Sequence, residues 1–232
     1  GNFKGFLGWS SSNQQVLSLE ESRAATEAHR EAGLVVQYDR EVQAADDRFG
    51  PIFEAYAQRP ITELAQDPEA TEIGQRLFLQ NCAQCHGSNA MGGKGFPNLT
   101  DNDWLYGGSP EAIKTSLIQG RRGAMPAFDA QFSDQQISEL ATYVLSLSGR
   151  KVDPEMAAAG KPNFAVCAAC HGMDGKGNQQ LGAPNLTDNI WLYGGSQEAI
   201  EETLHNGRNG VMPAWIDILG EDKIHVISAY VY

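Results

Sequence analysis

The sequence predicts an all-α fold that contains two copies of one helical unit. Residues 98–117 align without gaps on residues 185–204 and are identical at 15 of the 20 positions. Helix-starting residues recur at matching places in the two copies, and the strict apolar–polar alternation of a half-buried strand is nearly absent. A repeat with an offset of 87 residues therefore organises the chain, and two similar units follow each other along it.

We expect three segments: residues 1–69 outside the repeat, the first unit over 70–150 and the second over 151–232. The opening stretch, GNFKGFLGWSSSNQQ, mixes Gly and Ser with large apolar residues. That composition suits an extended segment that docks on another surface. A helical pattern runs from 19 to about 43, Gly50-Pro51 is expected to end it, and a short helix should cover 52–57.

Three helices are expected in the first unit, each opened by a capping residue. Asp67 stands before a proline and should start a helix that leads to the first cysteine pair. Ser109 likewise precedes a proline, and this second helix should end near Gly120. Ser133 has a glutamine three residues later, a capping box that predicts a last helix reaching about Leu147.

The second unit should repeat this plan from Pro154. Pro162 is expected to interrupt its first helix, and its last helix should end with the sequence at Tyr232. Each unit holds only about 80 residues, which is marginal for a self-sufficient hydrophobic core. A buried prosthetic group would therefore contribute much of each core.

All four cysteines lie in two C-x-x-C-H motifs, Cys82 and Cys85 before His86, and Cys167 and Cys170 before His171. This pattern is the attachment signature of haem c. One helical turn lets two thioethers hold the porphyrin edge while the following imidazole binds the iron. A thioredoxin-like redox pair or a four-cysteine zinc site remains an alternative, although nothing alternates strand with helix and the pairs lie far apart.

The second iron ligand is predicted from the repeat. Met125-Pro126 and Met212-Pro213 coincide at the offset of 87, and a thioether is a soft ligand that raises the reduction potential of haem iron. Packing in a core is the alternative interpretation of a methionine, and we assign it to the three that lack a counterpart, Met91, Met156 and Met173. The unmatched histidines are expected to be exposed, with iron binding by one of them as the alternative: His29, His205 and His225.

Aromatic and basic residues near these motifs are candidate contacts of a haem edge or propionate. The two WLYGGS segments place aromatic side chains with a hydrogen-bond donor at matching positions, and arginines precede each Met-Pro by three or four residues. Plain core aromatics and solvated arginines are the alternatives. The candidates are Trp104, Tyr106, Trp191, Tyr193, Arg121, Arg122 and Arg208. No catalytic constellation has usable spacing, so no catalytic residue is predicted.

The paired C-x-x-C-H and Met-Pro motifs resemble tandem class I cytochrome c domains, and the opening segment with NLTD-x-x-WLYGGS resembles the CcoP (FixP) family, the dihaem subunits of cbb3-type cytochrome c oxidases. The resemblance implies a membrane anchor outside this sequence and a place on the periplasmic face of the bacterial inner membrane. It also implies two covalent haems c, ligated by His86 with Met125 and by His171 with Met212. Electrons would pass from a soluble cytochrome c to the monohaem cytochrome c subunit and the oxygen-reducing, proton-pumping haem–copper subunit.

Charge and chain length separate this interpretation from its alternatives. The chain has 17 Lys and Arg against 29 Asp and Glu, a net charge of −12, which argues against a nucleic-acid partner. No apolar run approaches the roughly 18–20 residues that span a bilayer. A free-standing periplasmic dihaem carrier would need little more than the two units, and a dihaem peroxidase or haem sensor would need an open iron. An acidic surface on the second unit, with Glu201, Glu202, Asp217, Glu221 and Asp222, is our candidate docking site for a basic electron donor.

Overall fold

The computed structural model describes residue 24 and residues 27–28, 30–33 and 36–232. The chain divides into two compact units, residues 1–52 and 53–232. The predicted extended opening segment and much of the helical pattern predicted over 19–43 lie outside the described residues. None of the helices in the described part combines the length and apolar character needed to cross a bilayer.

One long helix, α2 (Gln37–Ala57), runs from the first unit into the second. The predicted break at Gly50-Pro51 is wrong, because Pro51 lies inside this helix. The helix tolerates Pro51 because this position is exposed. The backbone carbonyl that proline leaves without a helical hydrogen bond can be hydrated by water.

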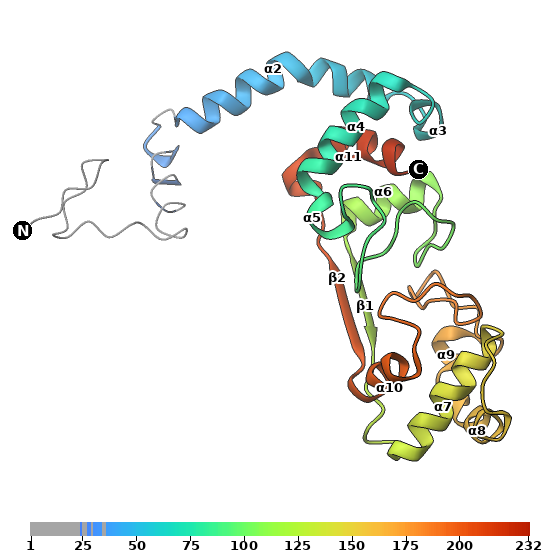
Figure 1. Ribbon diagram of the computed structural model, residues 1–232. Coiled ribbons are helices and arrows are strands. Elements are labelled where there is room, and N and C mark those ends of the chain that lie inside the picture. Colours follow the sequence, from blue (N-terminus) through green and yellow to red (C-terminus); the bar gives the residue numbers. More distant parts are fainter. Residues whose placement is uncertain (1–23, 25–26, 29, 34–35) are drawn as a thin grey trace, which may run out of the picture. The chain divides into compact units, whose positions relative to one another are not determined.

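Residues 53–232 are mostly helical, as predicted, and the helices for which a capping residue was predicted begin at that residue. The Asp67 side chain accepts hydrogen bonds from the backbone N–H groups of Glu69 and Ala70, and Ser133 forms the predicted capping box with Gln136. Figure 1 shows the helices in order along the chain: α3 (Ile61–Leu64), α4 (Pro68–Asn81), α5 (Ala83–His86), α6 (Pro110–Gln119), α7 (Asp134–Leu147), α8 (Pro154–Gly160), the 3-10 helix η1 (Lys161–Val166), α9 (Ala168–His171), α10 (Gln197–Asn206) and α11 (Ile216–Val231).

Two short strands depart from the all-α prediction. β1 (Arg121–Met125) pairs antiparallel with β2 (Arg208–Met212), and the register sets Gly123 opposite Gly210. These two glycines are equivalent in the repeat, so the ladder is symmetric about its centre. Neither RRGAM nor RNGVM has a strand pattern, and each is extended because it pairs with its own repeat-related copy.

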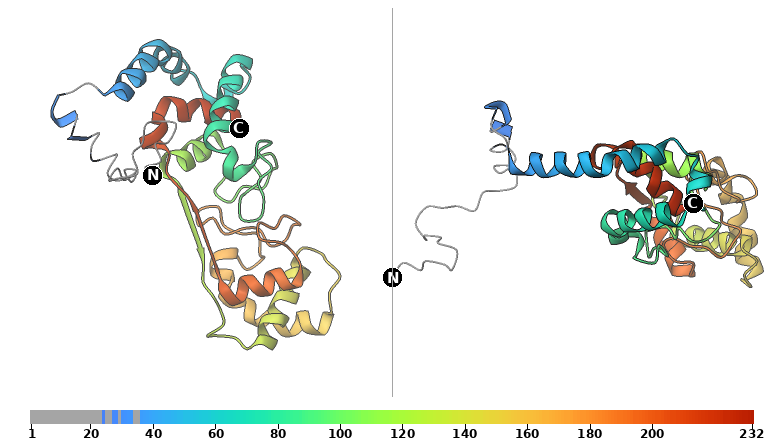
Figure 2. Two further views of the ribbon diagram at one scale, coloured as in Figure 1. Left: turned by 60° about the vertical axis from the view of Figure 1, so that its left-hand side comes forward. Right: turned by 90° about the horizontal axis from the view of Figure 1, so that it is seen from above.

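The last helix of each repeat packs on the other repeat. Helix α11 packs against α3, α4 and α6, whereas α7 packs against α8, η1 and α10. Figures 1 and 2 show this from different sides: α11, in red, lies with the green helices of the first repeat, and α7 lies with the yellow and orange helices of the second. The last helix of each repeat therefore contributes to a core that contains helices of the other repeat, and we call this arrangement the exchange.

Two hydrophobic cores result, and we name them by the cysteine motif that each contains. In the first-motif core, the crossing of α4 and α11 needs a glycine, because a Cβ at Gly74 would lie 2.7 Å from the Cβ of Tyr230. In the second-motif core, a Cβ at Gly160 would lie 2.1 Å from the backbone oxygen of Glu139. The buried members of the first core are Phe78, Cys82, Ala90, Ile113, Leu117, Leu219, Ile224 and Ile227, and those of the second include Ile137, Leu140, Val144, Phe164, Cys167, Ile200 and Leu204.

A further buried group joins the segment before α4 to α11. We call it the α3 cluster, and it consists of Tyr56, Ile61, Leu64 and Ala70. Val226 and Ala229 of α11 pack into it, and Leu64 and Val226 are fully buried. The residues just before the first repeat thus pack on α11, which also contributes to the first-motif core.

Candidate haem-binding sites

Each C-x-x-C-H motif forms a single helical turn, α5 in the first repeat and α9 in the second. In both turns the first cysteine is buried and the second is exposed, and all four thiols are free. Burial raises the pKa of the Cys82 and Cys167 thiols to about 11, which keeps them protonated near neutral pH. A redox dithiol works through a thiolate of lowered pKa, so this environment does not favour that alternative.

The histidine of each motif is held by a hydrogen bond to a proline carbonyl. His86 Nδ1 lies 3.0 Å from the oxygen of Pro97, and His171 Nδ1 lies 2.9 Å from the oxygen of Pro184. Since a carbonyl only accepts, Nδ1 donates in both cases and the proton-free Nε2 can bind a metal. Burial also lowers the pKa of His171, which favours the neutral imidazole that iron ligation requires.

Two glycines shape the WLYGGS segment of each repeat. The first takes a left-handed backbone, with φ of 92° at Gly107 and 104° at Gly194. The second leaves room for the tryptophan ring, because a Cβ at Gly108 would lie 2.5 Å from Trp104 Nε1. The segment therefore folds each tryptophan side chain back over its own turn.

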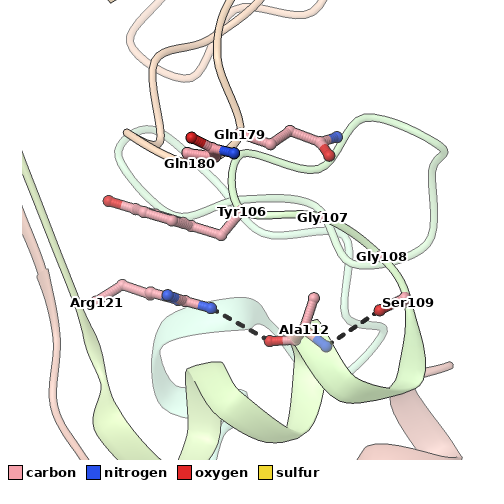
Figure 3. A pocket seen from close by; sticks show the side chains of 8 residues that line it. All are labelled: Tyr106, Gly107, Gly108, Ser109, Ala112, Arg121, Gln179 and Gln180. Carbon is pink, nitrogen blue, oxygen red and sulfur yellow. Dashed lines mark hydrogen bonds between the residues drawn. The ribbon is translucent and has the colours of Figure 1, made fainter.

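Arginine and tyrosine form the same stacked pair in both repeats. The Arg121 guanidinium lies 4.5 Å from the centre of the Tyr106 ring, and Arg208 lies 4.6 Å from that of Tyr193. Figure 3 shows Arg121 parallel to Tyr106 at the edge of a pocket of about 430 Å³. Four of the predicted candidates thus form two pairs, whereas the Trp191 ring lies 5.7 Å from the Arg150 guanidinium and Arg122 is exposed.

Several buried polar atoms at these places have no partner. Among the described residues, four buried side-chain atoms lack a hydrogen bond: Tyr106 Oη, Trp191 Nε1, Arg208 Nη2 and His225 Nδ1. Three of these belong to the predicted propionate contacts, and all three can donate. A buried donor without an acceptor costs free energy, so the arrangement suits an anionic group that supplies the missing acceptors. The residues present therefore fit a haem at each motif.

Both predicted methionine ligands are partly buried against hydrophobic cores. Met125 packs against the second-motif core, which contains Cys167, and Met212 packs against the core that contains Ile113 and Leu117 of the first repeat. A second pocket, of about 370 Å³, is lined by Met125 and Arg208 together with neighbouring residues of β1 and β2. Each methionine thus packs against a core that includes residues of the other repeat.

Some predictions about the remaining methionines and histidines are wrong. Met91 and Met173 are 58% and 81% exposed, so they do not fill a core. His225 is buried because the segment before α4 packs on α11. The Nε2 atom of His225 lies 2.8 Å from the backbone oxygen of Arg59. His205 is partly exposed and bonds the Asp129 side chain, and His29 lies outside the described residues.

The predicted acidic docking surface is divided. Glu201 and Glu202 lie on α10, whereas Asp217, Glu221 and Asp222 lie on α11, which packs in the other core. Glu221 also pairs with Lys114 at 2.8 Å. The five carboxylates do not share one helix or one core.

Sequence reasoning missed the residues that support the ligands. Pro97 and Pro184 supply the carbonyls for the two histidines, and Gln179 donates to the backbone oxygen of Trp104 at 3.1 Å. The prolines had a detectable signal, because each precedes the repeated Asn-Leu-Thr-Asp by one residue. The sequence holds no such signal for Gln179, because its hydrogen bond joins one repeat to the other.

Comparison with known proteins places this site in a family. The family model described as "Cytochrome C oxidase, cbb3-type, subunit III" matches residues 69–144 and again 155–231. The chain belongs to this family. Its two matches coincide with the two repeats, and the resemblance seen in the sequence is confirmed. The chain is an electron-transfer subunit of the cbb3 oxidase type, in a cytochrome c family that carries haem c.

Curated relatives agree along the whole chain. The cbb3-type cytochrome c oxidase subunit CcoP of Rubrivivax gelatinosus is 42% identical over 233 residues, which cover 100% of this chain and 69% of that protein. The subunit FixP of Sinorhizobium medicae is 40% identical over 193 residues, 77% of this chain and 67% of that protein. FixP of Rhizobium meliloti is 36% identical over 243 residues, 99% of this chain and 76% of that protein.

Proposed function

We propose that the chain relays electrons through two covalently bound haems c, one at each C-x-x-C-H turn. The observation that carries the proposal is the duplicated histidine geometry, in which Nδ1 of His86 and of His171 bonds a proline carbonyl. That bond fixes the tautomer and aims the free Nε2 as a ligand. Haem c supplies a one-electron iron couple whose potential the protein sets.

The chain's own residues attach, ligate and orient each haem. Cys82 with Cys85 form the thioethers of one site, and Cys167 with Cys170 those of the other. His86, His171, Met125 and Met212 would bind the two irons. The two Tyr–Arg stacks and the WLYGGS tryptophans would contact the propionates, because three of their buried donors, Tyr106 Oη, Trp191 Nε1 and Arg208 Nη2, lack partners.

Two protein ligands on each iron leave no position for a substrate. Hence the chain is not itself catalytic and serves the terminal oxidase as an electron relay. We place it on the periplasmic face of the bacterial inner membrane, in contact with the monohaem cytochrome c subunit and the haem–copper subunit. A soluble cytochrome c is its electron donor. These assignments follow from the family resemblance and from the electron-transfer role.

The test is an optical spectrum of the dithionite-reduced full-length holoprotein, recorded before and after addition of carbon monoxide. A pyridine haemochrome assay on the same sample should give two haems c per chain. We expect the spectrum to stay unchanged, because both irons carry protein ligands. Binding of carbon monoxide by one wild-type haem would instead indicate an open iron and favour a peroxidase or a sensor.

A further inference from the structure

We propose that Glu202 lowers the reduction potential of the haem attached by the second cysteine motif, and that the haem attached by the first motif has no such carboxylate. We call these groups the second-motif haem and the first-motif haem. The inference rests on the proposed haem attachment and goes beyond it, because it states how two nearly identical sites come to differ in potential. Glu202 acts through its ion pair with Arg208, so it is a positioning residue and not a ligand.

The Tyr–Arg stacks of the two repeats share one geometry. The guanidinium lies 4.5 Å from the ring centre in the first stack and 4.6 Å in the second. Arg121 Nε donates to the hydroxyl of Ser116 at 2.9 Å, and Arg208 Nε donates to the hydroxyl of Thr203 at 3.0 Å. Each hydroxyl stands on the helix before its strand, at equivalent positions of the repeat. This shared geometry gives the two haems no difference in potential.

Charge distinguishes the two stacks. Arg208 Nη1 donates to the Glu202 carboxylate at 3.3 Å, whereas the offset of 87 places Thr115 at the equivalent position of the first repeat. Arg121 instead donates to the backbone oxygen of Ala112 at 3.4 Å, and no carboxylate in the described part of the chain pairs with it. The pocket beside Arg121 is lined without any acidic residue (Figure 3). Arg121 therefore keeps its full positive charge, while Glu202 balances that of Arg208.

The Glu202 carboxylate is ionised at neutral pH. The hydrogen bond from Arg208 holds the pKa of Glu202 below its ordinary value. Lys94, in the loop after the first cysteine motif, lies 4.0 Å from the same carboxylate. The Lys94 side chain is 69% exposed, against 18% for Arg208, so water screens the charge of Lys94 far more strongly. The carboxylate therefore acts mainly on Arg208.

The ion pair changes the potential because oxidation adds one positive charge to a haem iron. A guanidinium near the propionates disfavours that charge and raises the potential, and a carboxylate beside the guanidinium opposes this effect. Arg208 can serve both partners, since its buried Nη2 lacks a partner in the protein and its Nη1 is held by Glu202. The resulting bias favours electron transfer from the second-motif haem to the first-motif haem.

Redox titration of the full-length holoprotein, followed at the α-band, tests this charge effect. Glu202→Gln keeps an acceptor for Arg208 and removes only the charge, so the reduced-to-oxidised ratio of one haem at a fixed ambient potential should rise by about threefold. Thr115→Glu is the reciprocal variant and should lower that ratio for the other haem. The matched control is Glu201→Gln, which removes the neighbouring charge; Glu201 accepts from Gln197 at 2.8 Å, and its loss should change either ratio much less.

A spectroscopic label shows which haem responds. Cys167→Ala leaves the second-motif haem with a single thioether, which moves its reduced α-band to longer wavelength. In that background Glu202→Gln should shift the titration of the marked haem, and Thr115→Glu that of the unmarked one. Should the Cys167→Ala chain fail to mature, the two variants must still move different components of a two-component titration of the otherwise wild-type chain.

Unchanged potentials in Glu202→Gln, or a response of the same haem to both variants, would overturn the inference. The difference between wild type and Glu202→Gln should also shrink as ionic strength rises, because the Glu202 side chain is 48% exposed. A difference that does not depend on salt would show that charge is not its cause and would overturn the inference too. These results leave the proposed function intact, which fails instead if the wild-type chain holds fewer than two haems or binds carbon monoxide.

Discussion

The exchanged packing makes a quantitative prediction about Leu64 and Val226. Both side chains are fully buried in the α3 cluster, so neither truncation can be relieved by solvent. Leu64→Ala should lower the free energy of unfolding by about 3 kcal/mol, and Val226→Ala by about 2 kcal/mol, from lost burial and the cavity left behind. Because the two side chains share one cluster, the double variant should deviate from additivity by about 1 kcal/mol.

Guanidinium unfolding of the holoprotein, followed by far-UV circular dichroism, measures this coupling. The matched control combines Leu64→Ala with Glu139→Ala, the position on α7 that is equivalent to Val226. Glu139 lies on α7, which packs against α8, η1 and α10, and its carboxylate accepts a hydrogen bond from Gln135 at 2.8 Å, so this pair should be additive within about 0.5 kcal/mol. Coupling of Leu64 to Glu139 and not to Val226 would refute the exchange.

Three further predictions concern single sites. Gly120→Ala should lower the free energy of unfolding of the holoprotein in guanidinium by more than Gly149→Ala does. Both glycines have positive φ, but only a Cβ at Gly120 would clash with a backbone oxygen of β2. Equal losses would contradict this close approach. The hydrogen bond that His205 donates to the Asp129 carboxylate raises the pKa of His205. The stability that this pair contributes is therefore complete below the unfolded pKa of about 6.5 and is lost as pH rises through the folded value. The difference in unfolding free energy between wild type and Asp129→Asn should therefore shrink from pH 6 to pH 9, and a constant difference would exclude the linkage. Tyr106→Phe removes a buried hydroxyl without a partner and should lower the potential of one haem in a redox titration, while an unchanged potential would show that this hydroxyl contacts no propionate.

Local chemistry made much of the fold predictable. The caps at Asp67 and Ser133 fixed helix starts because their side chains satisfy backbone N–H groups whatever surrounds them. The cysteine motifs were equally local, since a single turn holds each one. Pro51 shows the limit of such reasoning: its exposed place in α2 tolerates a residue that usually ends a helix.

The exchange was not predictable from the repeat itself. Two nearly identical units offer two packings with almost the same contacts: Gly74 at the α4 crossing, for example, accepts either last helix, because Tyr143 and Tyr230 are equivalent. Only the positions at which the copies differ distinguish the packings. One such position is occupied by Glu139 in the first copy and by Val226 in the second. It distinguishes the two packings only once α3 is known to cover Val226. That contact joins the segment before the repeat to the last helix of the chain, and no local pattern records it.

The ladder that carries the exchange also bears on the choice between an electron relay and a haem enzyme. Met125 is paired with Arg208 and Met212 with Arg121, so both methionines are terminal residues of one antiparallel ladder. Each arginine is held in turn by its stacked tyrosine and by side chains of the preceding helix. Displacing either methionine would therefore disturb the ladder and the backbone of the other. An enzyme that must open one iron gains nothing from such coupling, whereas a relay benefits from ligands that stay in place during a change of oxidation state.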